Sequence, residues 1–587
     1  MPDKGRWLMR FGGRRCTWRV SSRSFLLLLF YTVFIWCCEL LDFLCWLAGM
    51  PQTTAVSRLT ALLMAALLMF YVIGLPKREK NRTDLFFMAG CAFIFVFFAV
   101  KGIRPDMSYD TQNYHLLSQI PGFADNIHYH VIPGRFQMFG FRLGDRLFYP
   151  FRILLGLRMG TLFNAVVMLV LYRQTTAFLA WFERRVRPDR QSSLFISWPS
   201  VLAFFIVSRF ELIQESGSYM VELAALPFLI EMVFLLVRDR DGENTFCEAC
   251  VFCLLGGILF CLKMTNIVYL APLVILYLIK IRKSVTPAMF AVCLAAGIIP
   301  VTIYLGYNGI STGNPVYPYY NTFFKSPYYS DVNFKDPRWG PQSALEILLW
   351  PLYMIFFPGY RLSEIWCEFN WDLAVVLAGA AVVGGGGIRA LVCRRNPVFR
   401  QEIRMMVLFV CSAFAWTVST GHIRYYMGGL VIGGIMAAFL FLRMIYCGRS
   451  VRKAAALFLA VPFLIRAEYG YQSVWQGNEW AMRDGNMAAY RENIPFVFRD
   501  RQLFSDEALD KIDRIYLTWG DYGSYARLAG DNVPVWNRYS ITNELSSFRA
   551  EYEEEIRQAM ENGEGVYDMF PQGREVLDEY LAWMNEA

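Results

Sequence analysis

The residues of this chain whose types and spacing could carry out chemistry lie in one short segment, RPDMSYDTQNYHL at positions 104–116. The segment holds two carboxylates four residues apart, Asp106 and Asp110, followed by Tyr114 and His115. It comes directly after an apolar run, where a membrane helix would emerge into water, and ionisable residues at such a boundary are costly to desolvate and usually functional. A positioned carboxylate can act as a general base. We predict that role for Asp110, with Asp106 as the second candidate.

The composition predicts a polytopic membrane protein. The 587 residues are 56% hydrophobic and 18% charged, against about 25% charged in soluble domains. Separate apolar runs of this kind favour helices, because backbone groups in lipid must be paired within the segment. We expect about 13 transmembrane helices and a small C-terminal soluble α/β domain. The predicted helices cover residues 25–50, 59–75, 85–100, 154–172, 194–208, 219–237, 249–262, 267–280, 288–305, 372–391, 405–420, 427–446 and 454–465.

Charge patterning predicts the topology and three domains. Residues 1–23 form a basic arm, which the positive-inside rule places in the cytoplasm. Residues 24–466 form the transmembrane catalytic domain, with large periplasmic loops at 101–153 and 306–371. Residues 467–587 carry 23 acidic and 11 basic residues and form a periplasmic acidic α/β domain, with strands expected at 512–519 and 533–536 and a helix at 546–561. Because the basic excess lies in short loops that set topology, no nucleic-acid partner is predicted.

One apolar run does not fit the pattern in which successive helices end alternately on the outer and the cytoplasmic side of the membrane. Residues 344–357 are short and contain Pro351, so we interpret them as an interfacial or re-entrant segment. Residues 313–329, just before this run, are rich in proline and aromatic residues, as expected of a loop in the headgroup layer. Lys325 and Arg338 in this region are candidate contacts for lipid phosphate.

Polar residues gather on the predicted outer side. All four histidines of the chain are there, and so are charged residues at three different helix ends. This arrangement predicts a cavity open to the periplasm and the outer leaflet. The candidate substrate-binding residues are Tyr109, Tyr114, His115, Glu211, Glu215, Lys263, His422, Arg424 and Tyr425.

Each of these residues also has a structural interpretation. Asp110 could cap a helix that begins near Gln112, and Arg424 could be an interfacial arginine that reaches to the headgroups. Glu211 and Glu215 share one helical face and could simply face water. We predict no metal site. His128 and His130 could offer two ligands but lack a suitable set of carboxylates, and we interpret Cys247, Cys250 and Cys253 as packing cysteines.

Three segments resemble motifs of the GT-C superfamily of integral-membrane glycosyltransferases, which includes protein O-mannosyltransferases and aminoarabinose transferases. Asp110-Thr-Gln-Asn-Tyr-His resembles the acidic motif of the first external loop. His422-Ile-Arg-Tyr-Tyr is similar to a late Arg-Tyr segment, and the Gly-rich helix that ends in Lys263-Met-Thr is similar to one found mid-chain. Two more helices precede the acidic loop here than in the family, and the paired carboxylates are spaced as Asp106 and Asp110. Which of the two matches the family's base therefore stays open.

The resemblance implies a function for the outer cavity. The chain would be a glycosyltransferase of a bacterial inner membrane that takes a sugar from a polyprenyl-phosphate donor. It would transfer the sugar with inversion to a glycan, lipid or protein acceptor, and the aspartate would accept the proton of the acceptor hydroxyl. Arg424 and Lys263 would bind the lipid phosphate, and the tyrosines could stack on sugar faces. Membrane lipids are the other expected partners; no cofactor is expected, and a divalent cation is not favoured.

Two alternatives remain. A polymerase or ligase of lipid-linked glycans would use the same outer loops with a polyprenyl-diphosphate donor. A lipid or sugar transporter would need access from both faces, and the polar residues here cluster on one side.

Overall fold

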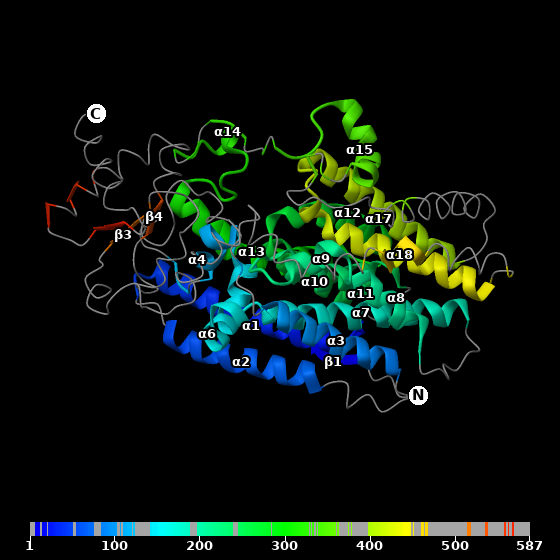
Figure 1. The fold of residues 1–587 in the computed structure, drawn as a ribbon. Helices are drawn as coiled ribbons and strands as arrows, with labels where there is room; N and C mark the ends of the chain where they lie inside the picture. Colours follow the sequence, from blue (N-terminus) through cyan, green and yellow to red (C-terminus); the bar gives the residue numbers. More distant parts are fainter. Residues whose placement is uncertain are drawn as a thin grey trace, which may run out of the picture.

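The structure, a computed structural model, consists mainly of long helices that lie side by side in one bundle (Figure 1). It describes residues 6–11, 14–19, 21–50, 54–74, 84–102, 110–119, 141–187, 196–238, 245–282, 284–327, 338–357 and 397–447, with shorter stretches between them and in the C-terminal part.

Eight membrane spans are present among the described residues, each long and apolar enough to cross a bilayer. Large apolar side chains on their outward faces, such as Val96, Ile298 and Phe414, are exposed, as a surface in contact with lipid requires. The chain is therefore a polytopic helical membrane protein, as predicted. The spans are carried by α1 (Arg23–Leu47), α3 (Leu85–Gly102), α7 (Leu162–Val186), α11 (Thr245–Leu262), α12 (Ile267–Ile281), α13 (Pro287–Thr312), α17 (Pro397–Ser419) and α18 (Met427–Cys447).

Other predicted segments are helical as well. They are α2 (Thr54–Gly74), α8 (Trp198–Val207), α10 (Glu222–Val237) and α15 (Ala344–Phe356). The 13 residues of α15 correspond to the run predicted to be interfacial, and Pro351 lies inside this helix. The predicted helix at 372–391 falls almost entirely outside the described residues, and that at 454–465 is described only in its second half, where it is helical, so the total of about 13 stays a prediction.

The predicted helix at 154–172 is wrong in its bounds. Residues up to Met159 belong to α6 (Leu143–Met159), and α7 begins only at Leu162. The two helices are separated at Gly160 and Thr161, and Gly156, whose φ of 80° is not helical and is favourable for glycine, adds a kink within α6. The outer loops are shorter than the predicted 101–153 and 306–371, because α6 already starts at Leu143 and α13 continues to Thr312.

The strands lie near the two ends of the chain. Within the basic arm, β1 (Arg6–Phe11) and β2 (Arg14–Arg19) form an antiparallel hairpin. In the C-terminal part, β4 (Val535–Asn537), β3 (Arg514–Leu517) and β5 (Val566–Asp568) form a parallel sheet in that order. Two of these strands fall where the sequence predicted them. Most of the predicted helix at 546–561 lies outside the described residues, and the predicted domain division stays a prediction.

Short elements at one end of the bundle position the polar residues. The short helix α9 (Phe210–Glu215) precedes α10, and the end of α3 is fastened to it by Lys101. The buried Lys101 ammonium donates hydrogen bonds to the carbonyl oxygens of Ile213 and, at 2.7 Å, of Gln214. A cation at the C-terminal end of a helix also complements the helix dipole. Lys101 therefore fixes the start of the acidic segment against the turn between α9 and α10.

Helices α11 and α13 pack closely through small residues. A Cβ atom added to Gly257 of α11 would overlap the backbone carbonyl of Gly297 in α13. The Sγ atoms of Cys250 and Cys293 lie 3.6 Å apart in the same interface, in agreement with a packing role for the α11 cysteines. Small residues allow helix backbones to approach in membranes, so this crossing sets where the C-terminal end of α11 lies.

We expect Gly257→Ala to destabilise the protein by about 1–3 kcal/mol, because the added methyl group meets backbone that cannot move aside. Thermal unfolding in detergent measures this as a lower midpoint temperature. The matched control is Gly309→Ala in α13, where an added Cβ atom is 3.6 Å from its nearest neighbour. Equal midpoints for the two variants would contradict the close packing of α11 on α13.

Candidate functional site

Asp110 lies at the start of a π-helical turn, η2 (Thr111–His115), shortly after the end of α3. Its side chain makes no capping hydrogen bond to this turn, so the capping interpretation is wrong. The carboxylate instead accepts a hydrogen bond from the guanidinium of Arg424, with 2.8 Å between Oδ2 and the nitrogen. Asp110 and Arg424 are 314 residues apart in the chain. The fold therefore joins the two predicted motifs directly.

Asp106 has a different environment. Its buried carboxylate accepts hydrogen bonds from the Thr111 hydroxyl (2.5 Å) and from the backbone N–H of Tyr219 (2.8 Å). These bonds tie the acidic segment to the turn before α10 and brace the start of η2. They favour Asp106 as the residue that holds the segment and Asp110 as the one that faces the cations.

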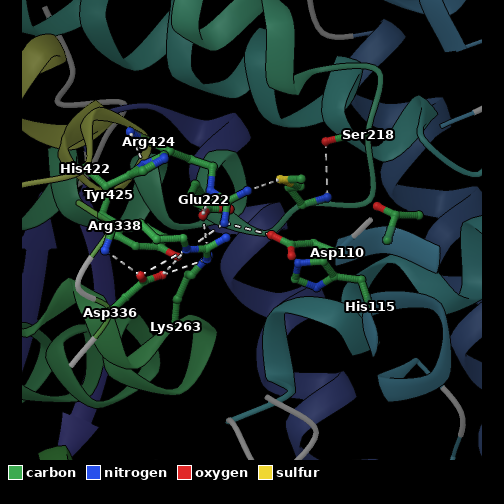
Figure 2. Close-up of polar contacts among 12 residues, drawn as sticks. Asp110, His115, Ser218, Glu222, Lys263, Asp336, Arg338, His422, Arg424 and Tyr425 are labelled. Carbon is green, nitrogen blue, oxygen red and sulfur yellow. Dashed lines mark hydrogen bonds and ion pairs between the residues drawn. The ribbon is translucent and has the colours of Figure 1, made fainter. Parts of the chain in front are cut away.

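Glu222, the first residue of α10, connects the two cations of the site. Its Oε1 atom lies 3.2 Å from Nε of Arg424 and also accepts a hydrogen bond from Lys263. Figure 2 shows Asp110, Glu222, Lys263 and Arg424 directed toward one another. We refer to these four residues as the ion cluster. Arg424 belongs to the turn η5 (Ile423–Tyr426) ahead of α18, and Lys263 stands between α11 and the turn η4 (Met264–Asn266).

Sequence analysis missed Glu222, because it took 219–237 as one apolar helix. The signal that could have identified Glu222 is a carboxylate in the first turn of a mostly apolar helix.

Tyr425 covers the two cations. Arg424 lies 5.2 Å and Lys263 lies 4.8 Å from the centre of its ring, and Arg424 also donates to the Tyr425 hydroxyl at 3.2 Å. The backbone carbonyl of Tyr425 accepts a hydrogen bond from Tyr269 at 2.8 Å. An aromatic face next to two cations is attracted to both of them, so Tyr425 orients both.

His422 supports the turn that carries Arg424. Its Nδ1 accepts the backbone N–H of Arg424 at 3.2 Å, and its carbonyl accepts the indole N–H of Trp416 at 2.7 Å. Burial, and then the charge of Arg424, hold the pKa of His422 well below its ordinary value. His422 is therefore neutral and serves as a hydrogen-bond acceptor that fixes the backbone of Arg424.

Glu211 and Glu215 do not face water. Glu211 lies 3.4 Å from Nε of Arg209, and both side chains are buried. Glu215 accepts the backbone N–H of Leu223 at 3.2 Å and hydrogen bonds to Glu222. Burial, and then the charge of Glu222, raise the pKa of Glu215 well above its ordinary value of 4.5. Glu215 therefore loses its proton less readily than an ordinary carboxyl group, and it contacts the ion cluster through Glu222.

His115 pairs with a residue that sequence analysis did not single out. Its Nδ1 atom lies 2.6 Å from Oδ1 of Asp145, near the start of α6, and both side chains are buried. Burial raises the pKa of Asp145, and the neighbouring His115 opposes that rise. The ring of His115 also lies 4.4 Å, centre to centre, from that of Tyr114.

Two further candidates, Lys325 and Arg338, form ion pairs with acidic residues close to them in the sequence. Lys325 pairs with Asp331 at 2.5 Å and Arg338 with Asp336 at 2.7 Å, and both cations are well exposed. Tyr109, His128 and His130 lie outside the described residues. Among the residues that the structure describes, no group of three or more histidine, cysteine or acidic side chains could hold a metal ion.

The charge of Arg424 controls the ionisation of Asp110. Burial alone would raise the pKa of this carboxyl group, but the charges of Arg424 and His115, with the hydrogen bond from Arg424, lower it below its ordinary 3.8. Asp110 is therefore ionised at neutral pH.

The depressed pKa predicts how stability depends on pH. A carboxyl group whose pKa is lower in the folded state stabilises the fold above its unfolded-state pKa, and the stabilisation disappears as pH falls through the folded-state value. As pH is lowered, the thermal stability of Asp110→Asn should therefore fall less than that of wild type, because the variant has no carboxyl group to protonate at this position. Midpoint temperatures between about pH 3 and 7, a range that includes the ordinary carboxyl pKa, measure the difference. Parallel curves for wild type and variant would contradict the ion pair.

No protein-family model matches this chain, and no curated protein matches its sequence. In three dimensions it is similar to ArnT from Cupriavidus metallidurans in the apo state, with a TM-score of 0.43 and 12% identity over 77% of this chain and 85% of that one. The ArnT structure bound to undecaprenyl phosphate gives a TM-score of 0.41 and 12% identity over 78% and 87%. Arabinosyltransferase EmbB from Mycobacterium smegmatis gives a TM-score of 0.34 and 10% identity over 73% and 45%.

Proposed function

We propose that this chain is a membrane glycosyltransferase of the GT-C type. It would move a sugar from a polyprenyl-phosphate donor to a glycan, lipid or protein acceptor. The observation that carries the proposal is the ion cluster, in which an arginine and a lysine from different helix ends share one carboxylate beside Asp110. The reaction would take place at the outer face of a bacterial inner membrane, where the donor lipid is anchored.

The cations suit the phosphate of a lipid donor. The guanidinium presents several N–H donors in a fixed plane, and the ammonium adds a mobile point charge. Arg424 is buried and Lys263 is partly buried, and both lie at the ends of membrane-spanning helices, where a lipid phosphate would arrive with its chain still in the bilayer. Such donors would stabilise the charge that develops on the phosphate as it leaves.

The carboxylate beside them suits the acceptor. In an inverting transfer, the acceptor oxygen attacks the anomeric carbon and the C–O bond to phosphate breaks, so that the lipid phosphate leaves with the electron pair. The acceptor hydroxyl loses its proton to a base, and Asp110 is ionised and adjacent to the phosphate-binding cations. A phosphate at Arg424 would compete for the guanidinium and so free the carboxylate to take the proton.

The direct test is in-vitro transfer from radiolabelled undecaprenyl-phosphate sugars, namely mannose, glucose, galactose, arabinose and N-acetylglucosamine, to extracts of native membranes. We expect wild type to transfer at least one sugar and Asp110→Asn to be slower by about 10²- to 10⁴-fold, the contribution of one positioned base. Asp106→Asn is the matched control and should lose stability rather than rate per folded molecule. If wild type transfers no sugar from any monophosphate donor but does transfer from a diphosphate donor, the result would instead favour the polymerase or ligase.

A binding experiment isolates the phosphate site. Lys263→Gln should weaken the binding of undecaprenyl phosphate by about tenfold to a hundredfold, because it removes one charge-assisted hydrogen bond. Lys325→Gln is the control, since that lysine is exposed and pairs with Asp331. Dissociation constants in lipid nanodiscs decide the matter, and equal affinities for the two variants would remove Lys263 from the site.

A further inference from the structure

One pair of buried titratable residues has no part in the mechanism proposed above. His115 and Asp145 are 3% and 7% exposed, and 2.6 Å separates Nδ1 from Oδ1. An ionised carboxylate at this distance accepts a hydrogen bond from Nδ1–H and so keeps the ring proton on Nδ1. The other ring nitrogen, Nε2, then carries a free lone pair and can accept a proton.

Nε2 of His115 is buried and has no hydrogen-bond partner among the residues that the structure describes. A buried polar atom without a partner is rare and usually has a functional cause. In the described part of the chain, Nδ1 is therefore held by Asp145 and Nε2 is unpaired.

The π-helical turn places His115 close to Asp110. With more than four residues per turn, η2 brings His115 round to the side of the chain on which Asp110 stands five positions earlier. Figure 2 shows the imidazole ring beside the Asp110 carboxylate, and the two groups interact electrostatically. π-helical turns occur frequently at functional sites.

We propose that His115, held by Asp145, is the residue that finally receives the proton of the acceptor hydroxyl. This inference rests on the proposed function. The acceptor oxygen bonds to the anomeric carbon, the C–O bond to the lipid phosphate breaks, and the proton passes by way of Asp110 to Nε2 of His115. The imidazolium that forms is stabilised by the Asp145 carboxylate, and its proton is released before the next cycle.

The electrostatics of Asp110 explain why a second acceptor is needed. A carboxylate in an ion pair with an arginine has a low affinity for protons. Arg424 pairs with Asp110 again once the lipid phosphate departs. An imidazole can hold a proton near neutral pH, which a carboxylate in such a pair cannot do. The ring of Tyr114 packs beside that of His115, and Lys263 and Glu222 also interact electrostatically with Asp145.

The first test needs no donor. The chain contains four histidines, so ¹⁵N-histidine NMR of the whole protein in nanodiscs can be assigned with single His→Gln variants. At about pH 7.5 we expect the His115 signal to show a proton on Nδ1 and none on Nε2. Asp145→Asn should abolish this preference. A wild-type ring protonated on Nε2, or on both nitrogens, would overturn the proposal.

The second test uses the sugar that wild type transfers. His115→Gln and Asp145→Asn should each slow transfer by about 10²-fold, as expected for a lost acid–base group. Both should bind undecaprenyl phosphate within about threefold of wild type, since neither touches the cations. Added imidazole should restore part of the rate of His115→Gln, an effect that a structural role does not predict.

The outcomes separate the two proposals. Full activity of a folded His115→Gln protein would overturn the role of His115 and leave the proposed function in place. Absence of transfer by wild type would overturn the proposed function together with this inference.

Discussion

The account depends on the ion cluster. Moving charges from water into a protein interior costs several kcal/mol per ion, and only close pairing with good hydrogen bonds offsets that cost. Each member here comes from a different part of the chain: Asp110 after α3, Glu222 at the start of α10, Lys263 after α11 and Arg424 before α18. The pairing therefore requires four helix ends to meet at one point.

The remaining contacts serve that requirement. Lys101 and Asp106 fasten the acidic segment to the turn before α10, and His422 fixes the backbone from which Arg424 extends. The ion cluster holds two cations and two carboxylates, so its formal charge is balanced. An arriving phosphate must then exchange with a carboxylate at the cations. That exchange couples donor binding to the release of the Asp110 carboxylate from Arg424.

Much of this could be predicted from the sequence, because two signals are local. Apolar runs specify membrane helices, and basic loops specify the side on which polar helix ends gather; together these brought Asp110, Lys263 and Arg424 to one side. Partners that depend on tertiary packing were missed. Glu222 was hidden within an apolar run, and nothing local in the sequence joins Asp145 to His115. The kink at Gly156 within α6 was missed too, since a hydrophobic pattern alone does not reveal a positive φ.

A structure of the protein in a lipid nanodisc with undecaprenyl phosphate tests the central claim most directly. The account predicts the phosphate within about 3 Å of both Arg424 and Lys263, the distance of a charge-assisted hydrogen bond, and Asp110 separated from Arg424. A phosphate bound elsewhere, with the Asp110–Arg424 pair intact, would contradict it.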